Sequence, residues 1–481
     1  MKANLTLLSN EEIDHIHGAT LDVLEKVGMK VFSNKILKIF IDNGLEVDLN
    51  KKVVKIPEYI VQESIKKTPK RFILCGRNPK YDIIVEHGKS YFGLGGTPPP
   101  YILDYETHEF RRSTKRDVAD AARLGDALEN ISFLMTIAGA YDVPCEVQYL
   151  HEYDAIVNNT EKPVVYPAPG ETIAKYMLTM AAEVVGDVEQ LVKRPILALY
   201  SEPPPPLMLA ETDENLLEFA KLGVPIALGP TAMAGSTGPI TIAGSAVISN
   251  AQALTAITLV QLINPGTPVL YACWVAATDP LTGRHAYGSP EFALSTSIVN
   301  SQMARYYGMP CFGFAGCPDS SEIDLQAGAE AMMMTLMNTL SGVNLMHDCG
   351  YIAGGDAGSM EMAVICNEIC SIALKIAKGF TVNQETLALK VIEEVGPGGH
   401  FLSHKHTLKF LEAGEIFVTK LFSRMPLVKA KKSKRQIYEA AKVKVKELLS
   451  KHYPDPLPKD TRRKLQNIIK EAEKFLVKSG V

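Results

Sequence analysis

The sequence lacks a strong excess of charge of either sign, a secretion signal and an obvious membrane segment. Its 481 residues hold 50 Lys and Arg against 54 Asp and Glu, a formal net charge of −4, and 46% of them are hydrophobic. A chain of this length and composition can bury a sizeable core. The Met-Lys-Ala-Asn start has no apolar signal segment, and we expect no stretch to cross a bilayer. We therefore expect a cytoplasmic protein with no membrane partner.

Recognisable metal-binding and phosphate-binding patterns are also missing. The eight cysteines are scattered, and Cys366 and Cys370 have helical spacing instead of a paired CxxC pattern, so we expect reduced and mostly buried thiols. The glycines of "GLGG" and "GPTAMAGSTG" fit neither a GxGxxG fingerprint nor a P-loop. We interpret them as turns in which the backbone approaches another segment closely.

Basic residues gather at the C-terminal end. From Lys429 onward there are 16 Lys and Arg against 6 Asp and Glu. The ordinary interpretation is a solvated helical surface, and the more specific one is a docking surface for an acidic protein partner. Because few aromatic residues are interleaved with these charges, we do not expect nucleic acid as a partner.

Short apolar segments bounded by turn residues alternate with helical patterns through most of the chain. The segments read as strands at residues 91–94, 131–137, 163–166, 195–200, 225–228, 268–274, 310–314 and 343–346. Helical patterns lie at residues 117–128, 171–185, 213–222, 243–262, 290–307, 324–340 and 359–378. Eight such units predict parallel strands closed into an α/β (β/α)8 TIM barrel.

The segments on either side of the barrel are expected to be helical. Residues 1–90 form a predicted N-terminal helical cap, with Ser9 as an N-cap and helices at 13–27 and 57–67. The barrel is assigned to residues 91–378, and residues 379–481 form a predicted C-terminal helical region.

The eighth predicted strand ends in titratable residues. In "SGVNLMHDCGYIAGGDAG" an apolar run stops at His347 and Asp348 and is followed by glycines. In a TIM barrel the active site is built from the loops that follow the strands, so both side chains are candidate catalytic residues. A single histidine in this position is also commonly a structural hydrogen-bonding group, and that reading stays open.

Aromatic and acidic residues recur at the other predicted strand ends, and almost no basic residue accompanies them. The end of the barrel where these strands terminate, which we call the mouth, therefore has a composition that suits a cation. Each tyrosine taken alone could also be an ordinary core side chain. The candidate substrate-binding residues are Thr97, Tyr101, Tyr166, Glu202, Trp274, Phe314, Asp319, Gln326 and Tyr351, with Tyr200 as a further aromatic face.

Three histidines follow the barrel in "GPGGHFLSHKHTL". His400, His404 and His406 have a spacing that places two of them on one helix face, as in a zinc pair. No cysteine or acid stands beside them in the sequence, so we expect a packing or lid role and assign no metal site.

Several longer segments resemble the trimethylamine methyltransferase (MttB) superfamily. They are "GGTPPPYILDYETHEFRRSTKRDVADAARLGDAL", "PTAMAGSTGPITIAGS", "INPGTPVLYACWVA", "DLQAGAEA" and "EEVGPGGHFLSHKHTLKF". The resemblance implies a (β/α)8 barrel that moves a methyl group from an amine to the cobalt of a corrinoid, or cobalamin, carried by a separate protein and not bound permanently. Founding members carry pyrrolysine, which is taken to capture the amine, whereas this sequence has only the twenty standard residues.

The resemblance is therefore to the non-pyrrolysine branch, whose members use quaternary amines such as glycine betaine. We expect a quaternary amine as substrate, a cognate corrinoid protein as partner and a homo-oligomer as the default assembly. Two alternatives remain from the residues: a barrel that binds quaternary amines or a corrinoid protein without turnover, and a metal-dependent lyase that uses the histidine cluster.

Overall fold

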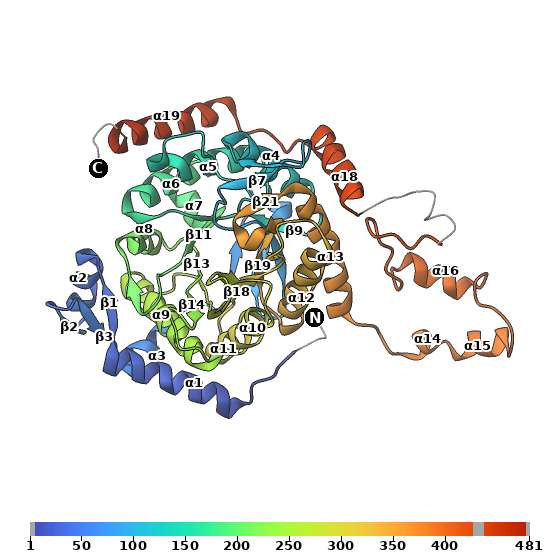
Figure 1. Cartoon of the computed structure of the whole chain (residues 1–481), viewed down its shortest axis with the longest axis horizontal. Helices are drawn as coiled ribbons and strands as arrows, with labels where there is room; N and C mark the ends of the chain where they lie inside the picture. Colours follow the sequence, from blue (N-terminus) through green and yellow to red (C-terminus); the bar gives the residue numbers. More distant parts are fainter. Residues whose placement is uncertain (1–4, 427–436, 478–481) are drawn as a thin grey trace.

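A closed sheet of eight parallel strands stands at the centre of the computed structural model, which describes residues 5–426 and 437–477 (Figure 1). The strands are β6 (Tyr91–Leu94), β9 (Ile131–Leu134), β10 (Val164–Pro167), β11 (Leu197–Ser201), β13 (Ile226–Leu228), β15 (Val269–Leu270), β18 (Phe312–Phe314) and β19 (Leu345–Cys349). Their order is β15-β13-β11-β10-β9-β6-β19-β18. A parallel bridge between Tyr271 and Cys311 joins the two ends, so the predicted barrel is confirmed.

Helices surround the barrel in the alternation that the sequence predicts. They are α4 (Lys115–Ala127), α5 (Gln148–Asn158), α6 (Gly170–Val185), α8 (Asn215–Leu222), α9 (Ile242–Ile263), α10 (Pro290–Leu294) with α11 (Asn300–Tyr307), α12 (Leu325–Ser341) and α13 (Met360–Lys378). All of these except α5 correspond to predicted helices. The sequence does not predict α5, because the charged residues Glu152 and Asp154 occupy buried positions of this helix and interrupt its apolar periodicity.

The interior of the barrel is packed with side chains and is not a channel. Phe133, Val165, Ala198, Leu270 and Phe312 belong to one buried cluster inside the strands. Phe133 fits because the neighbouring strand carries Gly93, where an added Cβ would lie 2.3 Å from the ring. Large and small side chains therefore alternate between strands, as dense packing requires.

One helix of the barrel is more hydrophobic than we expected from the sequence. The helix α9 is long and apolar enough to cross a bilayer, although no such stretch was expected. However, 78% of its apolar window is buried inside the protein. Its hydrophobicity therefore belongs to a core helix, which packs against β14 (Thr231–Ala234), β16 (Trp274–Thr278) and the helices of the N-terminal segment.

The first ninety residues contain more than the expected helical cap. The predicted helices are present as α1 (Asn10–Asp22), continued by a π-helical turn to Val27, and as α3 (Glu58–Lys67), and Ser9 caps α1 in a capping box. The same segment also forms α2 and five short strands. Their bounds are α2 (Asn34–Asp42), β1 (Met29–Val31), β2 (Glu46–Asp48), β3 (Val53–Lys55), β4 (Arg71–Leu74) and β5 (Ile83–Glu86).

A second small sheet lies on the carboxyl end of the barrel. It has the order β20-β21-β7-β8 and joins residues that follow the first and eighth barrel strands. Its strands are β7 (Tyr101–Leu103), β8 (Phe110–Arg112), β20 (Tyr351–Ile352) and β21 (Ala357–Ser359). This sheet joins the loop after β6, which contains Thr97, to the loop after β19, the strand that contains His347.

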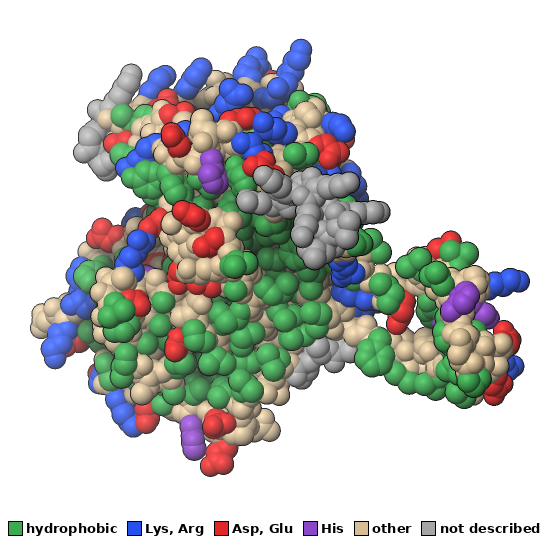
Figure 2. Space-filling view, turned by 45° about the vertical axis from the view of Figure 1, so that its right-hand side comes forward, with side chains coloured by type: hydrophobic (Ala, Val, Ile, Leu, Met, Phe, Trp, Pro, Cys, Tyr) green, Lys and Arg blue, Asp and Glu red, His purple; other side chains and the backbone are tan. Residues whose placement is uncertain are grey.

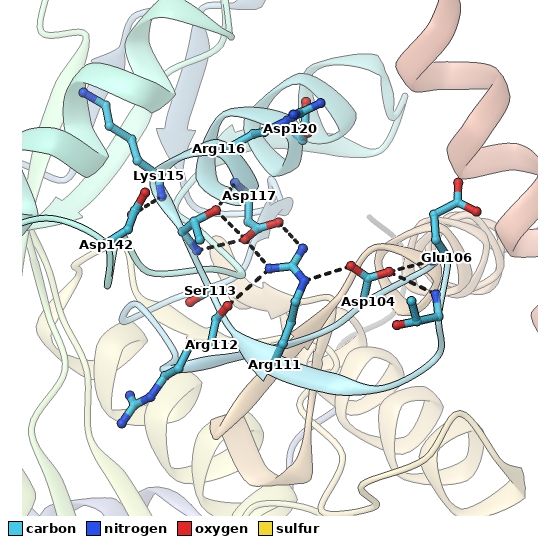
Figure 3. A network of polar contacts seen from close by, with 12 residues as sticks. Asp104, Glu106, Arg111, Arg112, Ser113, Lys115, Arg116, Asp117, Asp120 and Asp142 are labelled. Carbon is cyan, nitrogen blue, oxygen red and sulfur yellow. Dashed lines mark hydrogen bonds and ion pairs between the residues drawn. The ribbon is translucent and has the colours of Figure 1, made fainter.

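An ion-pair network fixes the β7–β8 hairpin to the start of α4 (Figure 3). The Arg111 guanidinium donates two hydrogen bonds of 2.7 Å to Asp117 and one of 2.8 Å to Asp104. Asp117 also accepts from the Thr114 N–H at the N-cap of α4. Burial tends to raise the pKa of Asp117, but Arg111 and Thr114 outweigh it and hold that pKa below its ordinary value.

The C-terminal region splits into two parts. Helices α18 (Ile437–Lys451) and α19 (Lys459–Leu476) return to the barrel and pack against its outer helices. Between α13 and α18, the short helices α14 (Gln384–Leu387), α15 (Leu389–Val395) and α16 (Lys405–Glu412) extend away from the barrel (Figure 1).

The basic C-terminal residues lie partly outside the described part of the chain. Lys429, Lys431, Lys432, Lys434, Arg435 and Lys478 are there. Among the described ones, Lys446 pairs with Glu106 and Lys464 with Glu183 of the same chain. These pairs engage part of the positive charge, and docking of an acidic partner on this surface stays a prediction.

We predict that Arg111→Ala lowers the free energy of unfolding by about 1–3 kcal/mol, because it leaves the buried Asp117 without its main partner. The loss stays below that of a fully buried pair because the Arg111 side chain is 42% exposed. Urea unfolding at pH 7 measures it. The control Arg116→Ala removes a 3.8 Å pair from a side chain that is 90% exposed and should change little. Equal stability of the two variants would contradict this role for Arg111.

Candidate functional site

His347 sits at the end of β19 and is enclosed by aromatic rings. Its ring centroid lies 4.4 Å from that of Phe314 and 5.6 Å from those of Tyr200 and Trp274. The residue is 2% exposed, and its Nδ1 has no hydrogen-bond partner among the described residues. Burial lowers the pKa of His347 to about 3. The imidazole is therefore neutral at physiological pH.

Asp348, the next residue, is buried in a strained backbone conformation. Its φ is +77°, in the left-handed region that side-chain-bearing residues rarely adopt, and its N–H donates to Gly95 O at 2.8 Å. Cys317 and Ala353, on neighbouring loops, also have φ of +56°. Such strain costs about 1–3 kcal/mol per residue and clusters at functional sites. Its concentration here marks this end of the barrel as the candidate site.

The two residues form a neutral pair. Burial, with a further contribution from the nearby Glu202, raises the pKa of Asp348 well above its ordinary value. His347 Nδ1 and Asp348 Oδ1 lie 3.5 Å apart. Since the histidine is deprotonated and the acid protonated, this contact is not an ion pair. Neither group supplies a fixed charge while the site is empty of a cation.

Glu202 is the acid that stays in contact with solvent. It follows β11 and is exposed at the mouth, where its carboxylate accepts hydrogen bonds from Tyr200 Oη (2.6 Å) and Thr97 Oγ1 (3.1 Å). Desolvation by the surrounding protein raises its pKa, although these two hydrogen bonds act against the shift. Glu202 is thus an acid whose ionised form a bound cation would stabilise.

Aromatic side chains gather at the same end of the barrel as these acids. Trp274, on β16 (Trp274–Thr278), is fully buried, donates its indole N–H to Phe312 O at 3.1 Å and contacts Phe314 at 4.5 Å between centroids. On the other side the Tyr351 hydroxyl donates to Thr97 O. The approach of Tyr200 and Trp274 is possible because Gly229 lies between them, where a Cβ would come within 2.8 Å of both rings.

Tyr166 is set behind this aromatic group. It is fully buried on β10, and its hydroxyl donates to Glu152 Oε2 at 3.0 Å. Burial raises the pKa of Glu152 to about 7, against hydrogen bonds from Gln148, the Ala140 N–H and Tyr166. In this structure the Tyr166 hydroxyl supports a buried carboxyl group, and its predicted substrate-binding role stays a prediction.

Two other predicted residues lie at the rim. Tyr101 is 41% exposed, and the Arg112 guanidinium lies 4.9 Å from its ring centroid and 5.2 Å from that of Tyr141. Asp319 accepts backbone hydrogen bonds from Tyr287 (2.9 Å) and Gly288 (2.8 Å). Asp319 thus shapes a loop of the mouth.

Gln326 is also placed away from the aromatic group. It is exposed near the start of α12 and donates to Glu330 Oε1 at 2.8 Å on the same helix. The inward reach expected from the sequence is not seen.

Sequence reasoning missed Tyr287 and Phe312. Tyr287 is half-buried, its ring centroid lies 6.3 Å from that of Phe314, and burial followed by nearby acidic groups, among them Glu202, raises its pKa. It lies in a loop between β17 (His285–Ala286) and α10, where no periodic pattern marks it. Phe312 could have been found, because it shares the strand and alternation of Phe314.

The histidine cluster is placed outside the barrel, on the extended segment. His404 caps α16 and accepts from the His406 N–H at 3.0 Å, while its Nε2 lies 3.1 Å from Glu394. His406 Nε2 lies 3.3 Å from Glu385 O. Within residues 5–426 and 437–477, no three His, Cys, Asp or Glu side chains are grouped to hold a metal ion.

Comparison with known proteins agrees with the resemblance drawn from the sequence. Residues 1–475 match the family model described as trimethylamine methyltransferase (MTTB). Trimethylamine methyltransferase MttB of Desulfitobacterium hafniense is 33% identical over 472 residues, or 97% of this chain and 93% of that protein. The Methanosarcina thermophila protein of the same name is 34% identical over 470 residues, or 96% of each chain.

A relative with another printed activity is equally similar. Glycine betaine methyltransferase of D. hafniense is 32% identical over 471 residues, or 97% of each chain. Identity alone therefore does not separate a tertiary-amine from a quaternary-amine substrate. Full-length coverage, the barrel and the match to the family model lead to one conclusion: the chain belongs to the trimethylamine methyltransferase (MTTB) family.

Proposed function

We propose that this protein transfers a methyl group from a quaternary amine, glycine betaine or a related betaine, to the Co(I) of a corrinoid carried by a separate protein. The observation that carries the proposal is the mouth itself, where Glu202 is hydrogen-bonded to Tyr200, one of the aromatic rings that pack around His347. Family membership supports methyl transfer, and the residues of the mouth support the choice of a cationic substrate.

The mouth has the features of a cation site. The faces of Tyr and Trp rings attract a cation by about 0.5–2 kcal/mol each, more when water is excluded. Ionised Glu202 adds a negative charge. Because the pKa of its carboxyl group is raised, a bound cation would shift this group toward its ionised form. Two arginines near the mouth are held at the rim, Arg112 between tyrosines and Arg284 against Asp356.

A quaternary amine needs only limited help from the protein. When its methyl group passes to Co(I), the C–N bond breaks with its electron pair left on nitrogen, and the cobalt electron pair forms the new bond to carbon. A neutral tertiary amine leaves, so no general acid is required. The neutral His347 and Asp348 pair adds no positive charge that would repel such a substrate.

The residues of this chain then hold and orient the substrate. Glu202 and the aromatic rings fix the ammonium group and direct one methyl group outward. The small sheet β20-β21-β7-β8 covers one side of the mouth and limits the entry of water. For the carboxylate end of a betaine, the candidate donors are the His347 ring N–H, the Thr97 hydroxyl and backbone N–H groups of the glycine-rich loops.

A tertiary amine fits this mouth less well. Trimethylamine is mostly protonated at neutral pH, and its lone pair must be engaged before a methyl group can leave. The pyrrolysine that is taken to serve this purpose in founding members is absent from this sequence. We therefore favour the quaternary substrate over the tertiary one.

The reaction can be tested directly with free cobalamin as acceptor. Under anaerobic reduction, conversion of Co(I) to methyl-Co(III) is followed by absorbance with glycine betaine, other betaines, trimethylamine, dimethylamine and methylamine. We expect transfer of one methyl group from a betaine and no measurable transfer from the three methylamines.

The same panel separates the competing functions. Activity on trimethylamine with none on any quaternary amine would contradict the proposed mechanism. Binding of a quaternary amine without transfer to free or protein-bound corrinoid would identify a binding protein. Metal analysis of the purified protein, with a stoichiometric metal required for activity, would identify a lyase-type site.

The role of Glu202 gives a prediction that does not depend on turnover. The chain has a single tryptophan, Trp274, so its emission reports directly on the mouth. We predict that Glu202→Gln weakens binding of glycine betaine at least about tenfold, since it removes the negative charge that faces the ammonium group.

The pH dependence follows from the raised pKa of Glu202. Below that pKa the carboxyl group is protonated and neutral, so wild-type affinity should increase as pH rises through the raised pKa and then level off. In Glu202→Gln this rise should be absent. The exposed Glu211→Gln variant, as a matched control, should behave like wild type. A Glu202→Gln variant that keeps both the affinity and the pH profile would refute a cation site at Glu202.

A further inference from the structure

The extended segment between α13 and α18 has no core of its own. Within residues 381–418, which we call the arm, not one residue is buried. Its helices α14, α15 and α16 have 4, 7 and 8 residues and line an open hollow of about 800 Å³ instead of packing together. Helices this short are not stable alone in water. The arm therefore needs a partner surface to hold its helical shape.

The exposed side chains of the arm show what kind of surface that is. Ten apolar residues are between 44% and 86% exposed, which is far more than scattered surface residues would give. They are Val382, Leu387, Leu389, Ile392, Phe401, Leu402, Leu408, Leu411, Ile416 and Val418. Their combined area, on the order of 1,000 Å², is enough for one side of a standard protein interface.

A matching apolar surface lies on the barrel of the same chain. Helix α12 has one charged residue, Glu330, in 17 positions. Leu325, Ala329, Met332, Leu336 and Leu340 recur at helical spacing along its solvent side, where Leu325 is 93% exposed. Figure 2 shows hydrophobic side chains gathered over the barrel body and again on the arm that projects from it.

From these two surfaces we infer that the protein forms a two-fold dimer in which the arm of each copy lies on the α12 stripe of the other. The arm starts directly after α13, which packs beside α12. A two-fold axis near this point covers both apolar surfaces of both chains at once and closes the assembly.

Other occupants fit less well. A corrinoid carrier must dock and leave in each catalytic cycle, so it would leave the arm without support for part of the time. Strongly apolar interfaces are typical of permanent assemblies. An anionic membrane would require a basic surface, whereas residues 381–418 contain three Lys and five Glu. A second copy is present permanently and carries the complementary surface.

Charge substitutions on each surface test the contact in the full-length chain. Variant A is Leu389→Glu with Ile392→Glu on the arm, and variant B is Ala329→Lys with Leu336→Lys on α12. We expect wild type to sediment at twice the chain mass of 52.6 kDa at micromolar concentration. Variants A and B alone should sediment as folded monomers, with folding checked by circular dichroism.

Mixing the two variants gives the decisive result. In a mixed dimer, the acidic arm of A meets the basic helix of B, and the other contact is native. Equimolar A and B should therefore regain the dimer mass. The control Leu49→Glu with Tyr59→Glu, at positions 66% and 64% exposed on the N-terminal segment, should remain dimeric.

Three outcomes would overturn the inference. A monomeric wild type excludes the dimer. A variant A that keeps the wild-type mass shows that the arm is not at the interface. A mixture of A and B that stays monomeric, or a variant B that stays dimeric, shows that the arm does not lie on α12 of a second copy.

Discussion

The hydrogen bond from Tyr200, one of the aromatic rings packed around His347, to the carboxylate of Glu202 is the interaction on which the mouth of this barrel depends. Glu202 is held by Tyr200 and Thr97 and keeps its contact with solvent. Its presence helps to keep the buried Asp348 protonated, because two ionised acids so close together in low dielectric would repel. The mouth therefore carries Glu202, whose pKa is raised, together with a neutral acid and a neutral histidine, and none of the three supplies a positive charge.

The parallel barrel makes this arrangement possible. All strands deliver their carboxyl ends to the same face, so residues as distant in sequence as Thr97 and Glu202 meet directly. The loops approach closely because of two glycines. A Cβ on Gly95 would lie 1.9 Å from Thr136 O, and one on Gly96 would lie 2.3 Å from Asp348 Oδ1. The strained conformation of Asp348 persists because these contacts and the bond to Gly95 O fix it from several sides.

Much of the fold could be predicted from the sequence, since apolar strands and amphipathic helices differ in period. The position of His347 and Asp348 at the barrel mouth could be predicted because the end of a buried strand marks that mouth, and their catalytic role stays a prediction. Tyr287 could not be found in this way, because it lies in a loop whose position is set by hydrogen bonds to Asp319, 32 residues away. Sequence position also does not reveal that Glu152 and Glu330 engage the side chains of Tyr166 and Gln326. The arm was expected to be helical, but its projection depends on contacts that periodicity does not encode.

The central claim is that the mouth selects positive charge and not merely a trimethylated shape. Glycine betaine and 3,3-dimethylbutanoate have nearly the same size and the same carboxylate, but a neutral carbon replaces the ammonium nitrogen in the second. Titration of each into the wild-type protein at pH 8, followed by Trp274 emission, compares the two. Cation–aromatic attraction and Glu202 together predict saturable binding of glycine betaine and at least about tenfold weaker binding of the neutral analogue. Equal affinities, or tighter binding of 3,3-dimethylbutanoate, would contradict the account.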